Sequence, residues 1–326
     1  MDPETQKNRT ARRVRVRQRR KRIRFLILGV FLALSAVLLF TRRWDSGTEP
    51  RPVDPETTQE SAFASSPTDG WEQRTVTERD LGRGTLLLVN RDHGYDADLP
   101  KTVSVWEHKT TNYFVKDIKL SVQPEAMDAL NRWMDAFAAE SGKRDVNIVA
   151  GWRSYDDQLQ LYQDAVAEKG QAHADAYIAL PGCSEHHTGL AVDLDTYNAE
   201  DGTSGGFDGK GAYAWAVEHA WEYGFIQRYP PEKKEITGID YEPWHFRYVG
   251  LPHAYVMAAE GLCLEEYLEY LRGFSFFGTH LSVSCLGRDY EIWFCPKERV
   301  IVPAAGDYTI SGNNADGCVV TVECQP

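Results

Sequence analysis

Apolar and polar positions divide the chain into successive stretches with different patterns. The first pattern is an uncharged run over 25–40 in which Ser35 is the one polar side chain. A helix of this length spans roughly 24 Å, and Arg24 and Arg42 at its ends can extend it toward the ~30 Å hydrocarbon core by snorkelling. No small-x-small cleavage site follows the run, which favours an uncleaved signal anchor over a cleaved signal peptide. We therefore predict a transmembrane anchor over 25–41.

The basic residues around this run predict its orientation. Eleven Lys and Arg residues precede it and two follow it. The excess of positive charge on the amino-terminal side places that side in the cytoplasm. We expect residues 1–24 to form a basic cytoplasmic tail, and the rest of the chain to lie outside the cell membrane as the larger part of a single-pass protein.

Residues 42–70 are rich in Pro, Ser, Thr and Glu and show no apolar period. Such a composition cannot bury enough apolar surface to offset the entropy lost on folding. This stretch is predicted to be a flexible linker.

Helical and strand-like periods alternate over 71–273. Apolar residues recur at helical spacing between Pro124 and Gly142, and Ser154 is a helix-capping residue after a short apolar strand. Strands are predicted over 86–90, 146–150, 189–194, 225–229 and 245–249, and helices over 124–142, 154–170, 172–180, 213–223 and 262–272. These elements predict an α+β fold, a small antiparallel sheet with flanking helices.

The pattern changes again after residue 273. Four short strand-like runs separated by turn residues predict a small β appendage over 274–326. A unit of this size is marginally stable alone, and it contains four of the six cysteines. Disulfides are permitted outside the cytoplasm, and four cysteines allow three connectivities, among which the sequence does not choose.

Charge is distributed unevenly along the chain. Of the net charge of −12, residues 1–43 carry +11 and the remainder −23. The basic block alone would suggest a nucleic-acid-binding arm. It adjoins the apolar run, however, and the acidic remainder would repel phosphates. We therefore expect no nucleic-acid partner.

Candidate chemistry gathers in two short blocks. The first reads Ser-Glu-His-His-Thr-Gly-Leu-Ala-Val-Asp over 184–193, and the second reads Glu-Pro-Trp-His over 242–245. His186, Asp193 and His245 supply imidazole and carboxylate ligands, and three protein ligands leave one tetrahedral position open, as in catalytic zinc sites. Glu242, three residues before His245, is the natural base for a water molecule at that position.

Both blocks resemble the zinc D-Ala-D-Ala carboxypeptidases of the VanY type and the related L,D-carboxypeptidases. The pattern of that family is Ser-x-His-(x)6-Asp followed by Glu-x-x-His, and both halves are intact here. The resemblance extends from about Leu86 to Gly273. It implies an α+β domain around one zinc ion per chain, with His186, Asp193 and His245 as ligands and Glu242 as catalytic base.

A third motif, Arg-Ser-Tyr-x-x-Gln over 153–158, also matches the family. The resemblance implies that Arg153 and Gln158 bind substrate. A guanidinium can hold the terminal carboxylate of a peptide through two hydrogen bonds, so Arg153 is also expected to take part in catalysis by positioning the departing residue. Ser184 is expected at the substrate site as well. His187 matches a ligand chemically, but the family has no ligand there, so we expect a surface or supporting residue.

Together these observations predict a membrane-anchored, extracytoplasmic zinc carboxypeptidase that removes the C-terminal D-alanine from peptidoglycan stem peptides. An L,D-carboxypeptidase acting on tetrapeptide stems would use the same metal set and remains an alternative. A non-catalytic cell-wall-binding module is an alternative of another class. The complete set of ligands and base disfavours it.

Overall fold

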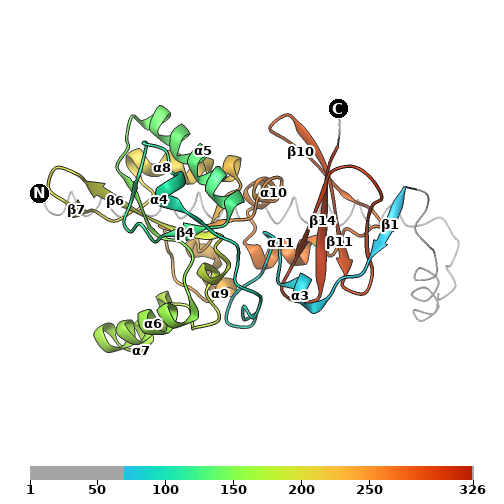
Figure 1. Ribbon diagram of the computed structural model, residues 1–326, viewed down its shortest axis with the longest axis horizontal. Helices are drawn as coiled ribbons and strands as arrows, with labels where there is room; N and C mark the ends of the chain where they lie inside the picture. Colours follow the sequence, from blue (N-terminus) through green and yellow to red (C-terminus); the bar gives the residue numbers. More distant parts are fainter. Residues whose placement is uncertain (1–69, 325–326) are drawn as a thin grey trace, which may run out of the picture. The chain divides into compact units, whose positions relative to one another are not determined.

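The computed structural model describes residues 70–324 (Figure 1). The chain divides into two compact units, 1–64 and 65–326, and every described residue belongs to the second. The predicted cytoplasmic tail, the predicted anchor and the predicted linker up to residue 69 lie outside the described residues. The α+β class predicted from the sequence is confirmed, since small sheets and helices alternate along the described chain.

The predicted membrane location needs correction. Among residues 70–324, no helix combines the length and apolar character needed to cross a bilayer. The predicted single-pass topology and its membrane partner therefore have no support in the described chain, and we withdraw both.

The larger sheet brings the two sequence blocks together. Its strand order is β3 (Phe114–Val115), β5 (Val146–Ala150), β6 (Ala191–Asn198), β9 (His245–Tyr248) and β8 (Phe225–Gln227), and β7 (Thr203–Ser204) pairs with β6 at one end. β3 and β5 are parallel and the other neighbours antiparallel. In the register of β6 and β9, Asp193 lies opposite His245. Residues 52 positions apart in the sequence are therefore direct neighbours.

Helix α5 (Pro124–Ser141) packs on this sheet because its apolar side chains recur on one face. It begins with proline at its first position and ends at Gly142, whose φ of 72° is left-handed. Trp133 is fully buried, and its ring lies 4.8 Å from that of Phe246 of β9. The apolar core under the site is thus built from α5 and the central strands.

The remaining elements surround this core. Helix α6 (Tyr155–Lys169) follows β5, with the Ser154 side chain accepting a hydrogen bond from the Asp157 amide as predicted. The other helices are α3 (Glu78–Leu81), α4 (Val105–His108), α7 (Gln171–Tyr177), α8 (Ala214–His219), α9 (Lys234–Thr237), α10 (His253–Glu260) and α11 (Leu264–Leu271). Short 3-10 helices are η1 (Glu185–Thr188), η2 (Gly211–Tyr213), η3 (Ala220–Tyr223) and η4 (Pro231–Lys233), and β2 (Val103–Ser104) pairs with β4 (Ser121–Val122).

The C-terminal strands form a second sheet. Its antiparallel order is β10 (Leu281–Cys285), β11 (Arg288–Pro296), β14 (Gly317–Cys324) and β13 (Tyr308–Gly312). β12 (Val300–Pro303) pairs instead with β1 (Trp71–Arg74), and Figure 1 shows the blue β1 beside the red strands. The boundary predicted at 273/274 stays a prediction, but this pairing crosses it. The sheet also shares one apolar core with α10 and α11.

One local prediction differs from the structure, and the cysteines, for which the sequence left disulfides open, form none. Residues 86–90 were predicted as a buried strand; Leu86 to Val89 are buried but belong to no sheet. Their backbone groups bond instead with residues 311–314 and with Arg247. All six cysteines are unpaired thiols, although Cys295 and Cys318 lie opposite each other in the register of β11 and β14.

Candidate active site

Three local structures carry the predicted metal ligands. His186 lies in η1, where the Ser184 hydroxyl accepts a hydrogen bond from the His186 amide at 3.4 Å. Gly189 ends this turn with a φ of 69°, a conformation that favours glycine. Asp193 follows on β6, and His245 begins β9 opposite it. A tight turn and an antiparallel pair therefore bring the three side chains to one point.

The distances between these side chains suit a small cation. His186 Nε2 lies 3.3 Å from Asp193 Oδ2, and His245 Nδ1 lies 2.9 Å from Asp193 Oδ1. One donor atom from each residue can be chosen so that all lie within 4.8 Å of one another. Ligand atoms about 2.0–2.1 Å from a tetrahedral zinc ion stand roughly 3.3 Å apart. The group fits such an ion with little rearrangement.

The hydrogen bonds on the outer side of each ring define which nitrogen can bind a metal. His186 Nδ1 lies 2.7 Å from the Gly151 carbonyl oxygen, which can only accept, so Nδ1 carries the proton and Nε2 the lone pair. His245 Nε2 faces a carboxylate oxygen of Glu185 at 3.3 Å, which leaves Nδ1 toward Asp193. Carbonyl and carboxylate partners of this kind are typical of metal-binding histidines.

The charges of the three candidate ligands also favour a bound cation. Burial would raise the pKa of Asp193, but the two histidines hold it well below its usual range. Burial also lowers the pKa of His245, but hydrogen bonds to Asp193 and Glu185 outweigh this and raise it to about 9. A carboxylate facing two imidazole lone pairs needs either protons or a metal ion between them, and a divalent ion satisfies all three at once.

Glu242 is a buried carboxyl group next to this centre. Its side chain lines the same cavity as the three candidate ligands, and its residue is 6% exposed. Burial raises its pKa to about 8, and the positive charges of His245 and Arg153 only partly oppose this shift. A carboxyl group whose pKa lies near neutrality is suited to accepting and returning a proton. Glu242 and the three candidate ligands therefore line one cavity.

Arg153 and Gln158 lie together on the cavity wall. Arg153 Nη1 donates to Gln158 Oε1 at 2.8 Å, and Arg153 Nη2 lies 3.9 Å from Asp193 Oδ2. Gln158 Nε2 donates to the Ala179 carbonyl at 2.7 Å, so both ends of its amide are engaged. Gln158 therefore orients the guanidinium group of Arg153, which contributes a positive charge to the cavity wall.

The cavity that these residues line has a volume of about 460 Å³. Beyond the predicted residues, including Ser184, its wall includes Tyr229 and Trp244 beside the ligands and Lys169 and His173 of the α6–α7 region. This volume lies in the usual range for small-molecule sites, and it combines aromatic walls with a few polar groups.

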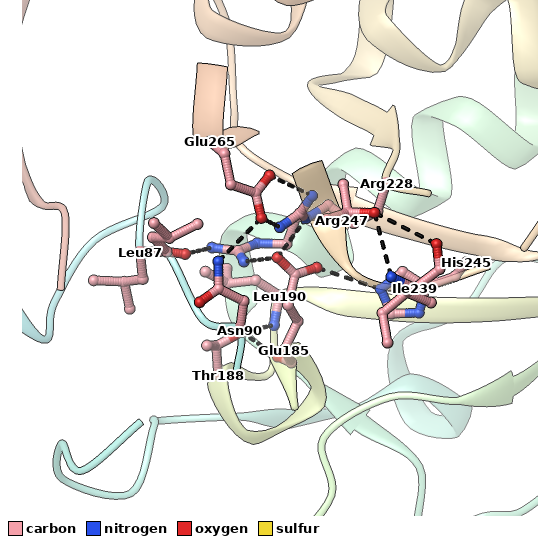
Figure 2. Close-up of polar contacts among 12 residues, drawn as sticks. Leu87, Asn90, Glu185, Thr188, Leu190, Arg228, Ile239, His245, Arg247 and Glu265 are labelled. Atoms are coloured by element: carbon pink, nitrogen blue, oxygen red, sulfur yellow. Dashed lines mark hydrogen bonds and ion pairs between the residues drawn. The ribbon is translucent and has the colours of Figure 1, made fainter. Parts of the chain in front are cut away.

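Two further residues lie beside the ligands. His187, expected as a surface or supporting residue, is buried and has contacts of the supporting kind: Nδ1 faces the Arg153 carbonyl at 2.8 Å, and Nε2 accepts from the Gly182 amide at 3.1 Å. Glu185 received no role from the sequence. Figure 2 shows its carboxylate between the His245 ring and the guanidinium groups of Arg228 and Arg247. No local pattern marks this role, because the arginine partners of Glu185 lie 43 and 62 positions away in the sequence.

Comparison with known proteins identifies relatives of the whole domain. The VanY family model, described as D-alanyl-D-alanine carboxypeptidase, matches residues 119–251. A D-alanyl-D-alanine carboxypeptidase of Enterococcus faecium is 35% identical over 266 residues, which cover 79% of this chain and 81% of that protein. The bifunctional D-Ala-D-Ala dipeptidase and carboxypeptidase VanXYC of Enterococcus gallinarum is 39% identical over 189 residues, covering 57% of this chain and 95% of that protein.

Among solved structures, the vancomycin-resistance D,D-dipeptidase VanXYg in complex with a D-Ala-D-Ala phosphinate analogue has a TM-score of 0.69 and 29% identity. The match covers 78% of this chain and 99% of that chain. The resemblance indicated by the sequence motifs is confirmed. The chain belongs to the VanY family of D-alanyl-D-alanine carboxypeptidases, which are zinc metallopeptidases.

Proposed function

We propose that the chain removes the terminal D-alanine from peptidoglycan stem peptides that end in D-Ala-D-Ala, with one zinc ion held by His186, Asp193 and His245. The observation that carries this proposal is the convergence of these three donors with a buried carboxyl group and a guanidinium around one cavity. The names of the related proteins support the substrate, since both curated relatives are described as acting on D-Ala-D-Ala.

The roles of the individual residues follow from charge and position. When bound, zinc would lower the pKa of a water molecule and polarise the scissile carbonyl. Glu242 accepts the proton of the attacking water and returns it to the leaving amine, for which its raised pKa suits it. Arg153, aligned by Gln158, binds the terminal carboxylate and so holds the departing residue in place. Ser184 lines the same cavity and is assigned to substrate binding.

The test compares two substrates with purified, zinc-loaded protein. Pentapeptide stems and tetrapeptide stems are incubated separately, and products are identified by mass spectrometry. We expect the pentapeptide to lose one D-alanine and the tetrapeptide to stay intact. A protein carrying Glu242→Gln, prepared in parallel, controls for contaminating peptidases.

Two other outcomes would contradict the proposal. Cleavage of the tetrapeptide alone would establish the L,D-carboxypeptidase alternative and refute the D,D assignment. Binding of stems without cleavage would establish a non-catalytic cell-wall-binding module and refute the enzymatic role of Glu242.

A further inference from the structure

A buried ionic cluster lies directly behind the candidate metal site. It consists of Glu185, Arg228, Arg247 and Glu265, two acids and two bases whose charges balance (Figure 2). The side chains of Arg228, Arg247 and Glu185 are fully buried, and that of Glu265 is 14% exposed. Burying charges costs several kcal/mol each unless their partners are well placed. The contacts of the cluster show what holds these charges in place and what they in turn hold.

Glu185 connects the cluster to the site. One carboxylate oxygen accepts hydrogen bonds from Arg228 Nε and Arg247 Nη1, each at 2.8 Å. The other oxygen faces His245 Nε2 at 3.3 Å. The two guanidinium groups therefore fix the direction of the Glu185 carboxylate. A fixed carboxylate holds the proton of His245 on Nε2, which directs Nδ1 toward Asp193.

Each arginine is in turn held from a different part of the fold. Arg228 forms a two-point ion pair with Glu265 of α11, at 2.8 Å and 2.6 Å, and Asn90 donates to the same carboxylate at 3.1 Å. Arg247 Nη2 donates to the carbonyl oxygens of Thr85 and Leu87, at 3.0 Å and 2.9 Å. The segment 85–88, which belongs to no sheet, thus provides two of the hydrogen bonds that fix Arg247.

The opposite side of segment 85–88 is held by the C-terminal sheet. The Leu86 amide donates to Ser311 Oγ at 2.9 Å, and the Leu88 amide donates to the Asn313 carbonyl at 3.2 Å. Asn314 Nδ2 donates to the Leu88 carbonyl at 2.9 Å. The backbone of residues 85 and 87 thus bonds to Arg247, and that of residues 86 and 88 bonds to 311–314, an alternation expected of an extended chain.

The approach between this region and the sheet is very close. A Cβ atom at Gly312 would lie 2.2 Å from the Leu81 carbonyl oxygen, and one at Gly84 would lie 2.4 Å from Ser311 Oγ. Neither position has room for a side chain. The chain just before segment 85–88 therefore lies directly against Ser311 and Gly312, which places the carbonyl groups of Thr85 and Leu87 beside Arg247.

From these contacts we propose that Glu185 is a positioning residue for His245, and that the C-terminal sheet helps to fix the metal site through segment 85–88 and Arg247. The inference rests on the proposed function in one respect, since it takes His245 as a zinc ligand. It gives the C-terminal sheet a role that the sequence left open.

Two matched pairs of variants test the two parts in the full-length chain. Glu265→Gln removes the charge that holds Arg228, whereas Glu266→Gln changes the neighbouring residue of α11, which pairs with Lys233. Asn314→Gly removes the side-chain bonds to Leu88 and Gly94 while keeping a residue that accepts the φ of 57°. Leu286→Gly is its control, at the other non-glycine position with positive φ in the described chain.

The readout is zinc affinity, measured on metal-free protein by competition with a chromophoric chelator, with the visible spectrum of the cobalt form as a second signal. Loss of a group that orients a metal ligand typically weakens metal binding by about 10–100-fold. We expect about tenfold weaker binding and a changed cobalt spectrum for Glu265→Gln, a several-fold loss for Asn314→Gly, and no change for either control. Circular dichroism and melting temperature show whether each variant is folded.

The outcomes separate the proposals. If Glu265→Gln fails to fold, Asn90→Ala replaces it, because this change loosens Glu265 without leaving a buried charge unpaired. If Glu265→Gln, or Asn90→Ala in its place, is folded and keeps the native zinc affinity and cobalt spectrum, the proposed role of the cluster in positioning His245 is wrong. Native affinity for Asn314→Gly, with the cluster variant weakened, would overturn the role of the sheet. If the unaltered protein binds no zinc, the proposed function itself fails.

Discussion

Replacing Arg153 with alanine tests recognition of the substrate carboxylate. The guanidinium is 20% exposed, is oriented by Gln158 at 2.8 Å, and lines the candidate cavity beside Asp193. A hydrogen-bonded pair involving a charged group contributes about 1.5–3 kcal/mol. Since each 1.4 kcal/mol corresponds to a factor of ten, we expect Arg153→Ala to lower kcat/KM by about 10- to 150-fold on a peptide with a free C-terminus.

The substrate provides the sharper comparison. Kinetics are measured on peptides ending in D-Ala-D-Ala with either a free or an amidated C-terminus. Amidation removes the charge that Arg153 is proposed to bind, so it should harm the unaltered enzyme strongly and Arg153→Ala little. Arg144→Ala is the control. Arg144 lies just before β5, as Arg153 lies just after it, but its side chain is exposed and donates a hydrogen bond to Asn112. Equal losses on amidation for the unaltered enzyme and Arg153→Ala would refute the assignment.

Two substitutions, one of them studied in two ways, test the chemistry at the centre of the site. Glu242→Gln should lower kcat by about 10²–10⁴-fold with zinc content unchanged, as steady-state kinetics and metal analysis will show; an unaltered kcat would exclude Glu242 as the base. His245→Ala should remove most of the bound zinc in metal analysis, and full stoichiometry would contradict the ligand assignment. In metal-free protein, burial raises the pKa of Glu242 to about 8 from 4.5, so its ionisation lowers stability as pH rises from about 4.5 to 8. Thermal melts should therefore show Glu242→Gln more stable than the unaltered protein at pH 8 or above and equally stable near pH 4, whereas parallel curves would contradict the burial argument.

The predicted site residues could be found from the sequence because their chemistry is local. His186 and Asp193 lie in one short block, and Glu242 and His245 in another. Side chains alternate between the two faces of a strand, so in the predicted strand over 189–194 the buried Leu190, Val192 and Leu194 leave Asp193 on the side of the site. The pairing of Asp193 with His245 could not follow from periodicity, since it depends on the register of β6 and β9.

The role of Glu185 was beyond the reach of sequence patterns. An acid beside a histidine is common, and its importance here comes from arginines 43 and 62 positions away. Segment 86–90 illustrates the same limit. Its apolar pattern predicted burial, which is confirmed, and a strand, which is wrong, because its backbone partners are side chains and a turn rather than a neighbouring strand.

The C-terminal sheet was predicted from its short strands, but its relation to the rest of the domain was not. Helix α10 and strand β13 were not predicted, because each is short and neither shows a clear helical or strand period. Tyr267 of α11 and Thr321 of β14 both bond to His253 of α10, at 2.8 Å and 3.1 Å. Contacts of this kind between distant elements depend on the fold, which no local pattern contains.

The bond between Leu86 and Ser311 joins residues 225 positions apart, and it has a consequence for the order of events during synthesis. Contacts of such separation form late, because a long loop must close before they stabilise the chain. A ribosome releases the catalytic residues before it releases 311–314. Segment 85–88 therefore gains its contacts with 311–314 only after nearly all of the sequence has been synthesised. A nascent chain that already contains every predicted metal ligand still lacks the residues that hold this segment against Arg247.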